Sequence, residues 1–174
     1  MKTALMIVDV QNSIVFDNGS MVHDADRILR NIATLLQKAR DSQTPVIFIQ
    51  HTSKTRTGFI EGSAGWEIHS AVKPLPHEKV IQKTVCDSFY ETALHQKLQN
   101  LKVERVVIAG LRTEMCIDTT SRRAFTLGYK VLLIEDAHST IDNSVLKAQQ
   151  IIDHHNVTLS KSFVELKKTA DFNF

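Results

Sequence analysis

The sequence predicts an α/β protein, a three-layer αβα sandwich around a six-stranded, mainly parallel, Rossmann-like sheet. Short β-branched apolar runs alternate with longer amphipathic stretches, a pattern that is typical of such sheets. The first run, residues 4–8, is apolar on both faces, as a central parallel strand must be. The 174 residues are 43% apolar and include only six glycines and three prolines. This composition favours one domain, residues 1–174, built of regular elements with short connections.

Apolar runs predict the strands, which we expect at residues 4–8, 46–49, 79–82, 103–109, 131–134 and 157–159. Apolar residues at helical spacing predict four helices, at residues 24–44, 90–100, 113–127 and 144–154. Pro45 ends the first of these helices, because proline disfavours a helical residue before it. Thr113 is a plausible N-cap of the third, and Gly128 ends it at the C′ position. Residues 51–77 hold three glycines and two prolines, and form the one long irregular connection.

Composition also bears on partners and location. The 21 Lys and Arg residues are scattered and nearly balanced by 19 Asp and Glu residues, so we expect no nucleic-acid partner. The apolar runs are far shorter than the roughly 20 residues that span a bilayer. Asp9 interrupts the first run before the core of a signal peptide could form. We therefore expect a cytoplasmic protein without a membrane partner. The two cysteines are too few to form a disulfide framework.

Three chemically distinctive residues follow predicted strands. Asp9 closes the first strand, Lys83 follows the third, and Cys116 lies one loop beyond the fourth. In open α/β sheets ligands bind outside the carboxyl ends of the strands, so these side chains are expected at one crevice. Each of these two residues also has a structural explanation when it is taken alone. Asp9 is then a turn acceptor, and Lys83 is a surface lysine.

Cys116 carries the strongest signal. If Thr113 is the N-cap, Cys116 is the third helical residue, where the helix dipole lowers the pKa of a thiol. A nearby Lys83 would lower this pKa further, and Asp9 would accept the thiol proton. Backbone N–H groups between Gly110 and Cys116 would then face the oxygen of a tetrahedral intermediate. A buried structural cysteine accounts for the position equally well.

Four blocks of sequence resemble one family. The segment VVIAGLRTEMCIDTTSRRAFTLGY, residues 106–129, closely resembles the isochorismatase-like cysteine hydrolases, which include nicotinamidases and N-carbamoylsarcosine amidohydrolases. Residues 7–12 (IVDVQN), 62–69 (GSAGWEIH) and 83–89 (KTVCDSF) resemble further motifs of that family, in the same order. The resemblance covers nearly the whole chain.

The resemblance implies a catalytic triad of Asp9, Lys83 and Cys116. It also implies a cis peptide bond between Leu111 and Arg112, and an oxyanion hole formed by the backbone N–H groups of Arg112 and Cys116. The Arg112 guanidinium either meets a substrate carboxylate or points to solvent or a subunit contact.

Other implications concern the substrate. Gln11, Phe16, Trp66 and Phe89 are candidates for the wall of the substrate pocket, although core or loop positions would explain them as well. True isochorismatases in this family lack the cysteine nucleophile, whereas this chain has Cys116. The resemblance therefore implies covalent hydrolysis of a small amide or ureide. Family likeness further predicts a homo-oligomer.

No metal or other cofactor is expected. Nicotinamidase-type members bind a metal through an Asp-X-His motif, and residues 50–52 here read Gln-His-Thr without the aspartate. An alternative from another class is a non-enzymatic module that binds a small ligand or a partner and uses Cys116 as a redox sensor, since an exposed low-pKa thiol is also what oxidants attack.

Overall fold

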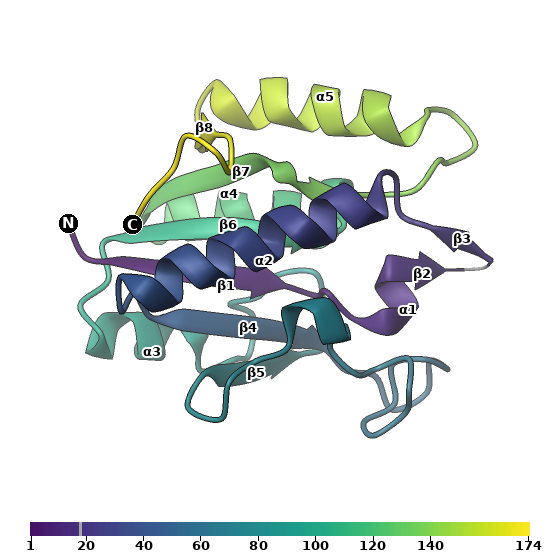
Figure 1. Cartoon of the computed structure of the whole chain (residues 1–174), viewed down its shortest axis with the longest axis horizontal. Coiled ribbons are helices and arrows are strands. Elements are labelled where there is room, and N and C mark those ends of the chain that lie inside the picture. Colours follow the sequence, from purple (N-terminus) through teal and green to yellow (C-terminus); the bar gives the residue numbers. More distant parts are fainter. Residues whose placement is uncertain (18) are drawn as a thin grey trace.

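The computed structural model describes residues 1–17 and 19–174. Six strands form one sheet in which every neighbouring pair is parallel. Their spatial order is β5 (Lys79–Lys83), β4 (Val46–His51), β1 (Thr3–Val8), β6 (Arg105–Leu111), β7 (Lys130–Ser139) and β8 (Glu165–Lys167). This arrangement, drawn in Figure 1, confirms the predicted three-layer αβα fold.

Helices cover both faces of the sheet. Helix α2 (Ala25–Asp41) lies across the front face in Figure 1, while α3 (Leu94–Asn100) and α4 (Asp118–Thr126) lie behind it. Alternate residues of β1 supply the two cores: Leu5 and Ile7 pack on the α2 side, and Ala4, Met6 and Val8 pack on the other. Burial on both faces is typical of an inner strand of a parallel sheet, which β1 is.

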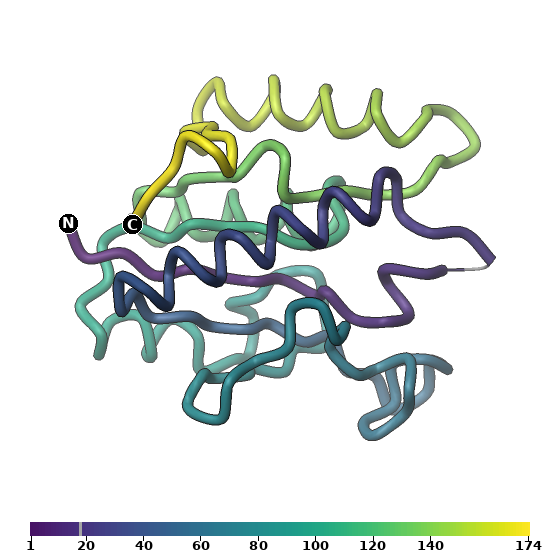
Figure 2. The backbone as a smooth tube through the Cα atoms, viewed as in Figure 1, coloured from purple at the N-terminus to yellow at the C-terminus, as the bar shows by residue number. Residues whose placement is uncertain are grey.

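The remaining elements are short or peripheral. They are α1 (Asn12–Val15), the strands β2 (Phe16–Asp17) and β3 (Ser20–Met21) of a two-stranded antiparallel sheet, the 3₁₀ turn η1 (Ser70–Val72), the π-helical turn η2 (Thr113–Ile117) and α5 (Ala148–Ser160). Figure 2 traces the long connection from β4 to β5, which projects at the lower right. As the sequence predicts, the connection is largely irregular, and η1 is the one helical element that the structure describes in it.

The sixth strand was predicted in the wrong place. Residues 157–159 form the end of α5, because Leu159 is fully buried at helical spacing from Ile152. The true sixth strand, β8, reads Glu-Leu-Lys and lies at an edge of the sheet. Strand β7 is also longer than expected, since it continues through residues 135–139.

Candidate active site

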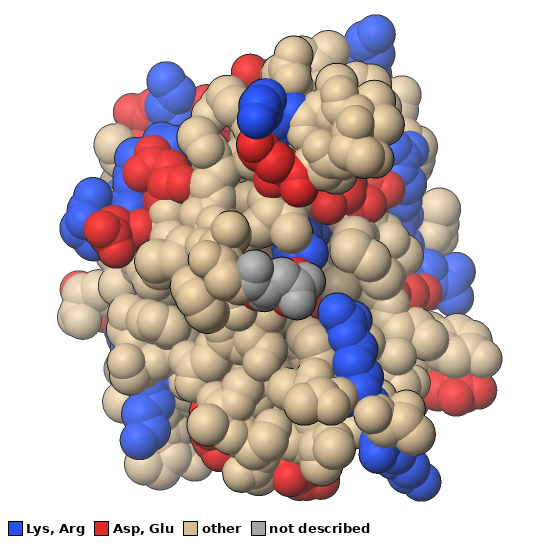
Figure 3. All heavy atoms as spheres, turned by 90° about the vertical axis from the view of Figure 1, so that its right-hand side faces the viewer, with Lys and Arg blue, Asp and Glu red and all other residues tan. Residues whose placement is uncertain are grey.

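Three strands bring the predicted catalytic residues to one edge of the sheet. Asp9 directly follows the central strand β1, Lys83 is the last residue of β5, and Cys116 lies in η2, which follows β6. The carboxyl ends of parallel strands lie at the same edge. Figure 3 faces this end of the molecule, where both basic and acidic side chains reach the surface.

Lys83 contacts both of the other two residues. Its Nζ lies 2.6 Å from Asp9 Oδ2 and donates a 3.2 Å hydrogen bond to Cys116 Sγ. It also donates to the carbonyl oxygen of Val85 at 2.9 Å. The side chains of Lys83 and Asp9 are both 0% exposed. Asp9 Oδ1 is buried and has no hydrogen-bond partner in the described part of the chain, so one carboxylate oxygen remains open to accept a proton.

Burial raises the pKa of the Cys116 thiol, and the negative charge of Asp9 raises it further. The positive charge of Lys83 acts in the opposite direction but is outweighed. The expected lowering of this pKa is therefore wrong, because the thiol is enclosed by protein beside a carboxylate. For Lys83, burial lowers the pKa, but Asp9 and Cys116 together raise it overall. Both shifts favour the protonated forms, a neutral thiol and an ammonium group.

The turn that carries Cys116 differs from an ordinary helix start. A cis peptide bond joins Leu111 to Arg112, and Arg112 is the N-cap residue of η2. Thr113 is therefore not the N-cap, and Cys116 is the fourth residue of the turn rather than the third. The Thr113 hydroxyl bonds instead to Nδ1 of His138 at 2.9 Å. This contact ties the beginning of the nucleophile's turn to strand β7.

A cavity of about 110 Å³ opens onto the catalytic residues. This volume suits a small ligand, because pockets for drug-sized molecules measure about 300–1,000 Å³. Its wall includes residues that the sequence analysis did not assign to a substrate pocket. With Asp9, Arg112 and Cys116, the lining residues are Ile14, His51, Arg56, Phe59, Cys86 and Met115.

The four candidates for the pocket wall lie elsewhere. Gln11 is buried and its side chain bonds to the backbone of His51 and to the carbonyl oxygen of Trp66. Trp66 donates its indole N–H to the Thr52 hydroxyl at 2.9 Å. Phe16 is 55% exposed, and Phe89 is buried in the core. None of these four side chains lines the 110 Å³ cavity, and the first two support the loop that does.

Arg112 reaches an acidic partner of its own. Its guanidinium lies 2.5 Å from Asp17 Oδ2, and both side chains are largely buried.

Among the described residues, no three His, Cys, Asp or Glu side chains are arranged to hold a metal ion. Within the same residues no helix is both long and apolar enough to cross a membrane.

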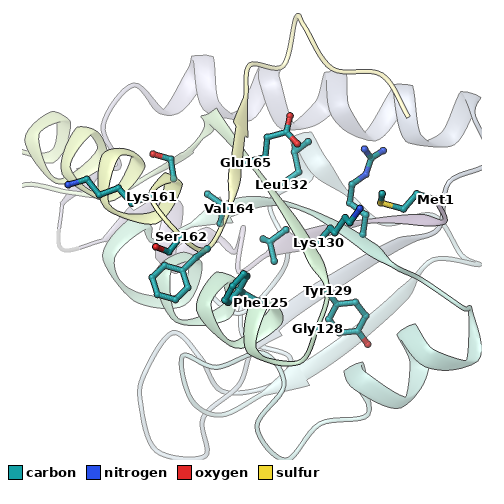
Figure 4. A pocket seen from close by; sticks show the side chains of 14 residues that line it. Met1, Phe125, Gly128, Tyr129, Lys130, Leu132, Lys161, Ser162, Val164 and Glu165 are labelled. Atoms are coloured by element: carbon teal, nitrogen blue, oxygen red, sulfur yellow. The ribbon is translucent and has the colours of Figure 1, made fainter.

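A second, larger hollow of about 660 Å³ lies at the amino ends of β7 and β8. Figure 4 shows its lining, which includes Phe125, Tyr129, Lys130, Lys161 and Glu165. The described residues that line it include no Cys, His or Asp. Two of the three predicted catalytic residues, Asp9 and Cys116, line the smaller cavity, and none of the three lines the larger one.

Comparison with known proteins identifies relatives over the whole length. Residues 3–161 match the family model of the isochorismatase domain. The chain is 34% identical to the uncharacterized isochorismatase family protein YddQ of Bacillus subtilis, with 99% of both chains covered. It is 37% identical to a streptothricin hydrolase of Streptomyces noursei, over 80% of this chain but only 55% of that protein.

Solved structures agree with this relationship. An isochorismatase family protein superposes with a TM-score of 0.88 at 31% identity, over 95% of this chain and 98% of that one. The crystal structure of an isochorismatase from Pseudomonas putida KT2440 gives a TM-score of 0.92 at 29% identity, over 97% of this chain and 88% of that one.

Proposed function

The chain belongs to the isochorismatase family of hydrolases, and from this premise we propose that it cleaves the C–N bond of a small amide or ureide through a thioester on Cys116. The observation that carries the proposal is the buried contact of Lys83 with both Asp9 and Cys116. Relatives with amide chemistry support it, among them nicotinamidase 3 of Arabidopsis thaliana and the ureidoacrylate amidohydrolase of Variovorax paradoxus.

Acylation begins with transfer of the thiol proton from Cys116 to Asp9. The sulfur then forms a bond to the substrate carbonyl carbon, and the carbonyl oxygen becomes an oxyanion. The backbone N–H groups of Arg112 and Cys116 stabilise that oxygen in our proposal. When the C–N bond breaks, Asp9 returns the proton to the departing nitrogen, and ammonia or an amine leaves.

Deacylation uses the same groups. Asp9 takes a proton from water, and the water oxygen attacks the thioester carbon. When the C–S bond breaks, the acid product leaves and Asp9 returns the proton to the Cys116 sulfur. In this mechanism Asp9 and Cys116 exchange negative charge, and the Lys83 ammonium lies between them, 2.6 Å from Asp9 Oδ2 and 3.2 Å from Cys116 Sγ. It therefore stabilises whichever of the two is ionised.

A panel of primary amides and N-carbamoyl compounds tests the proposal, with release of ammonia as the readout. We expect Cys116→Ala to lower turnover at least about 10³-fold while the thermal melt is retained, because removal of a nucleophile abolishes covalent catalysis. Rapid acid quench should trap an acyl adduct on the Cys116 peptide, also in Cys86→Ser protein. Turnover that survives in Cys116→Ala, or an adduct found on Cys86, would disprove the mechanism.

A further inference from the structure

We propose that Arg56 makes this site selective for small amides or ureides that carry an anionic group, such as a carboxylate, beside the reacting carbonyl. The inference rests on the proposed function and names the class of substrate. It follows from an inventory of the charges that line the 110 Å³ cavity.

Most charges at the cavity are already compensated. The Asp9 carboxylate is paired with Lys83 at 2.6 Å. The Arg112 guanidinium is paired with Asp17 at 2.5 Å, so its charge is largely neutralised before any substrate enters. Burial lowers the pKa of His51, and the charge of Lys83 lowers it further, so this ring is neutral near pH 7. Arg56 is the lining residue whose charge remains.

No acidic side chain pairs with Arg56 in the part of the chain that the structure describes. Its guanidinium carbon lies over the Phe59 ring, 4.5 Å from the ring centre, which is a cation–π contact. The backbone holds the residue as well, because its N–H donates to Ser53 Oγ and its carbonyl accepts from the N–H of Phe59.

The N–H groups of the Arg56 guanidinium remain available to a ligand, because the residue is exposed and has no acidic partner among the described residues. A guanidinium fits a carboxylate with two parallel hydrogen bonds, whereas a neutral group gains much less from it. The rest of the cavity includes the apolar side chains of Ile14, Phe59 and Met115. A charged ligand entering such a space needs a compensating charge, which Arg56 provides for an anion and for no other class.

Two thiol reagents of nearly equal size test the inference without a known substrate. Iodoacetate is anionic and iodoacetamide is neutral, and both react with the same thiolate. Their rates at Cys116 are measured by peptide mass at one fixed, mildly alkaline pH, in folded protein and in urea. Both rates are proportional to the fraction of Cys116 that is ionised, so this fraction cancels when one rate is divided by the other. The ratio therefore reports how the charge of the cavity affects the two reagents.

We expect the folded protein to favour iodoacetate by about fivefold relative to the unfolded chain, with the preference falling as salt is added. Arg56→Gln should abolish the preference. Arg122→Gln is the matched control, because Arg122 also lies 4.5 Å from a phenylalanine ring, that of Phe163, but does not line the cavity. This variant should keep the preference.

The outcomes separate this inference from the proposed function. Equal ratios in folded and unfolded protein, or a preference that survives Arg56→Gln, overturn the role of Arg56 and leave the mechanism untouched. Because the Cys116 pKa is raised, slow modification in folded protein is expected. No modification at all in folded protein, with rapid modification in urea, would show that small molecules do not reach Cys116 through the cavity and would count against both proposals.

Discussion

Cys116, the nucleophile in the proposed mechanism, lies between two neighbours of opposite charge. Its sulfur accepts a hydrogen bond from the Lys83 ammonium at 3.2 Å, yet burial and the Asp9 carboxylate raise the pKa of the thiol. The two neighbours therefore have opposite effects on the same proton. In the proposed mechanism this arrangement is useful, because Asp9 can remove the proton only when the substrate carbonyl is in place to receive the negative charge.

Asp9→Asn should separate reactivity from turnover. Removal of the carboxylate charge lowers the pKa of Cys116, so alkylation by iodoacetamide at neutral pH becomes faster, by about tenfold if the pKa falls by about one unit. Hydrolysis should nevertheless be lost, because the proton acceptor is gone. The pH dependence of alkylation in both proteins measures the shift. Slower alkylation in the variant would contradict the charge relationship described here.

The site could be predicted from sequence only in part. Asp9, Lys83 and Cys116 each follow a strand, and strand ends of a parallel sheet converge, so their proximity follows from the element order. Arg56 and Phe59 lie on the long connection between β4 and β5, whose path depends on contacts such as those of Gln11 with His51 and Trp66. No periodic signal reports such contacts, and these cavity residues were therefore missed.

At the scale of elements, burial explains which strands were found. The strand β1 is buried throughout and was predicted within a residue. The edge strand β8 alternates a half-buried Leu166 with exposed Glu165 and Lys167, so it has no apolar run to detect. In contrast, residues 157–159 have high strand propensity but remain helical, because tertiary burial of Leu159 outweighs local preference.

The central strands β1 and β6 leave no room for a side chain at Gly110. This residue has a φ of +130°, and a Cβ there would lie 2.0 Å from the carbonyl oxygen of Val8. Gly110→Ala should therefore destabilise the fold by roughly 3 kcal/mol, combining overpacking with backbone strain. For a chain of this size that corresponds to a fall in Tm of about 6–12 °C.

Gly128→Ala is the matched control for this prediction. Gly128 follows α4 with a φ of +91°, and a Cβ there would meet nothing within 4 Å. The control thus carries backbone strain without the steric contact, and should cost only about 1 kcal/mol. Equal melting temperatures for the two variants would show that the close approach of β1 and β6 is not what requires glycine.

At the scale of the whole molecule, one hydrogen-bonded chain links three elements behind the site. His138 of β7 accepts at Nδ1 from the Thr113 hydroxyl of η2 and donates from Nε2 to Asn156 Oδ1 of α5, each at 2.9 Å. Since the amide oxygen can only accept, Nε2 carries a proton. The lowered pKa of His138 favours the neutral ring, which leaves Nδ1 to accept from the Thr113 hydroxyl. The predicted homo-oligomer would add contacts between copies, and it stays a prediction.

Burial of His138 gives the whole fold a defined pH dependence. Burial lowers its pKa from 6.5 to about 4, and the nearby His155 lowers it as well, while Asn156 and Asp136 oppose the shift. Between these two values the unfolded chain binds a proton that the folded protein does not. The free energy of unfolding therefore falls as the pH falls through 6.5 toward 4, by about 3 kcal/mol in total from this residue.

Urea unfolding of the native protein and His138→Gln at a series of pH values measures this contribution. Glutamine retains a hydrogen-bond donor and acceptor but has no titrating group. The variant therefore lacks the contribution of His138 to the pH dependence of unfolding, while all other ionisable groups are the same in both proteins. The native protein should be the more stable near neutral pH, because imidazole satisfies both Thr113 and Asn156. That advantage should shrink by about 3 kcal/mol on acidification to about pH 4. A stability difference that stays constant with pH would mean that His138 accepts its proton without disturbing the chain that joins η2, β7 and α5.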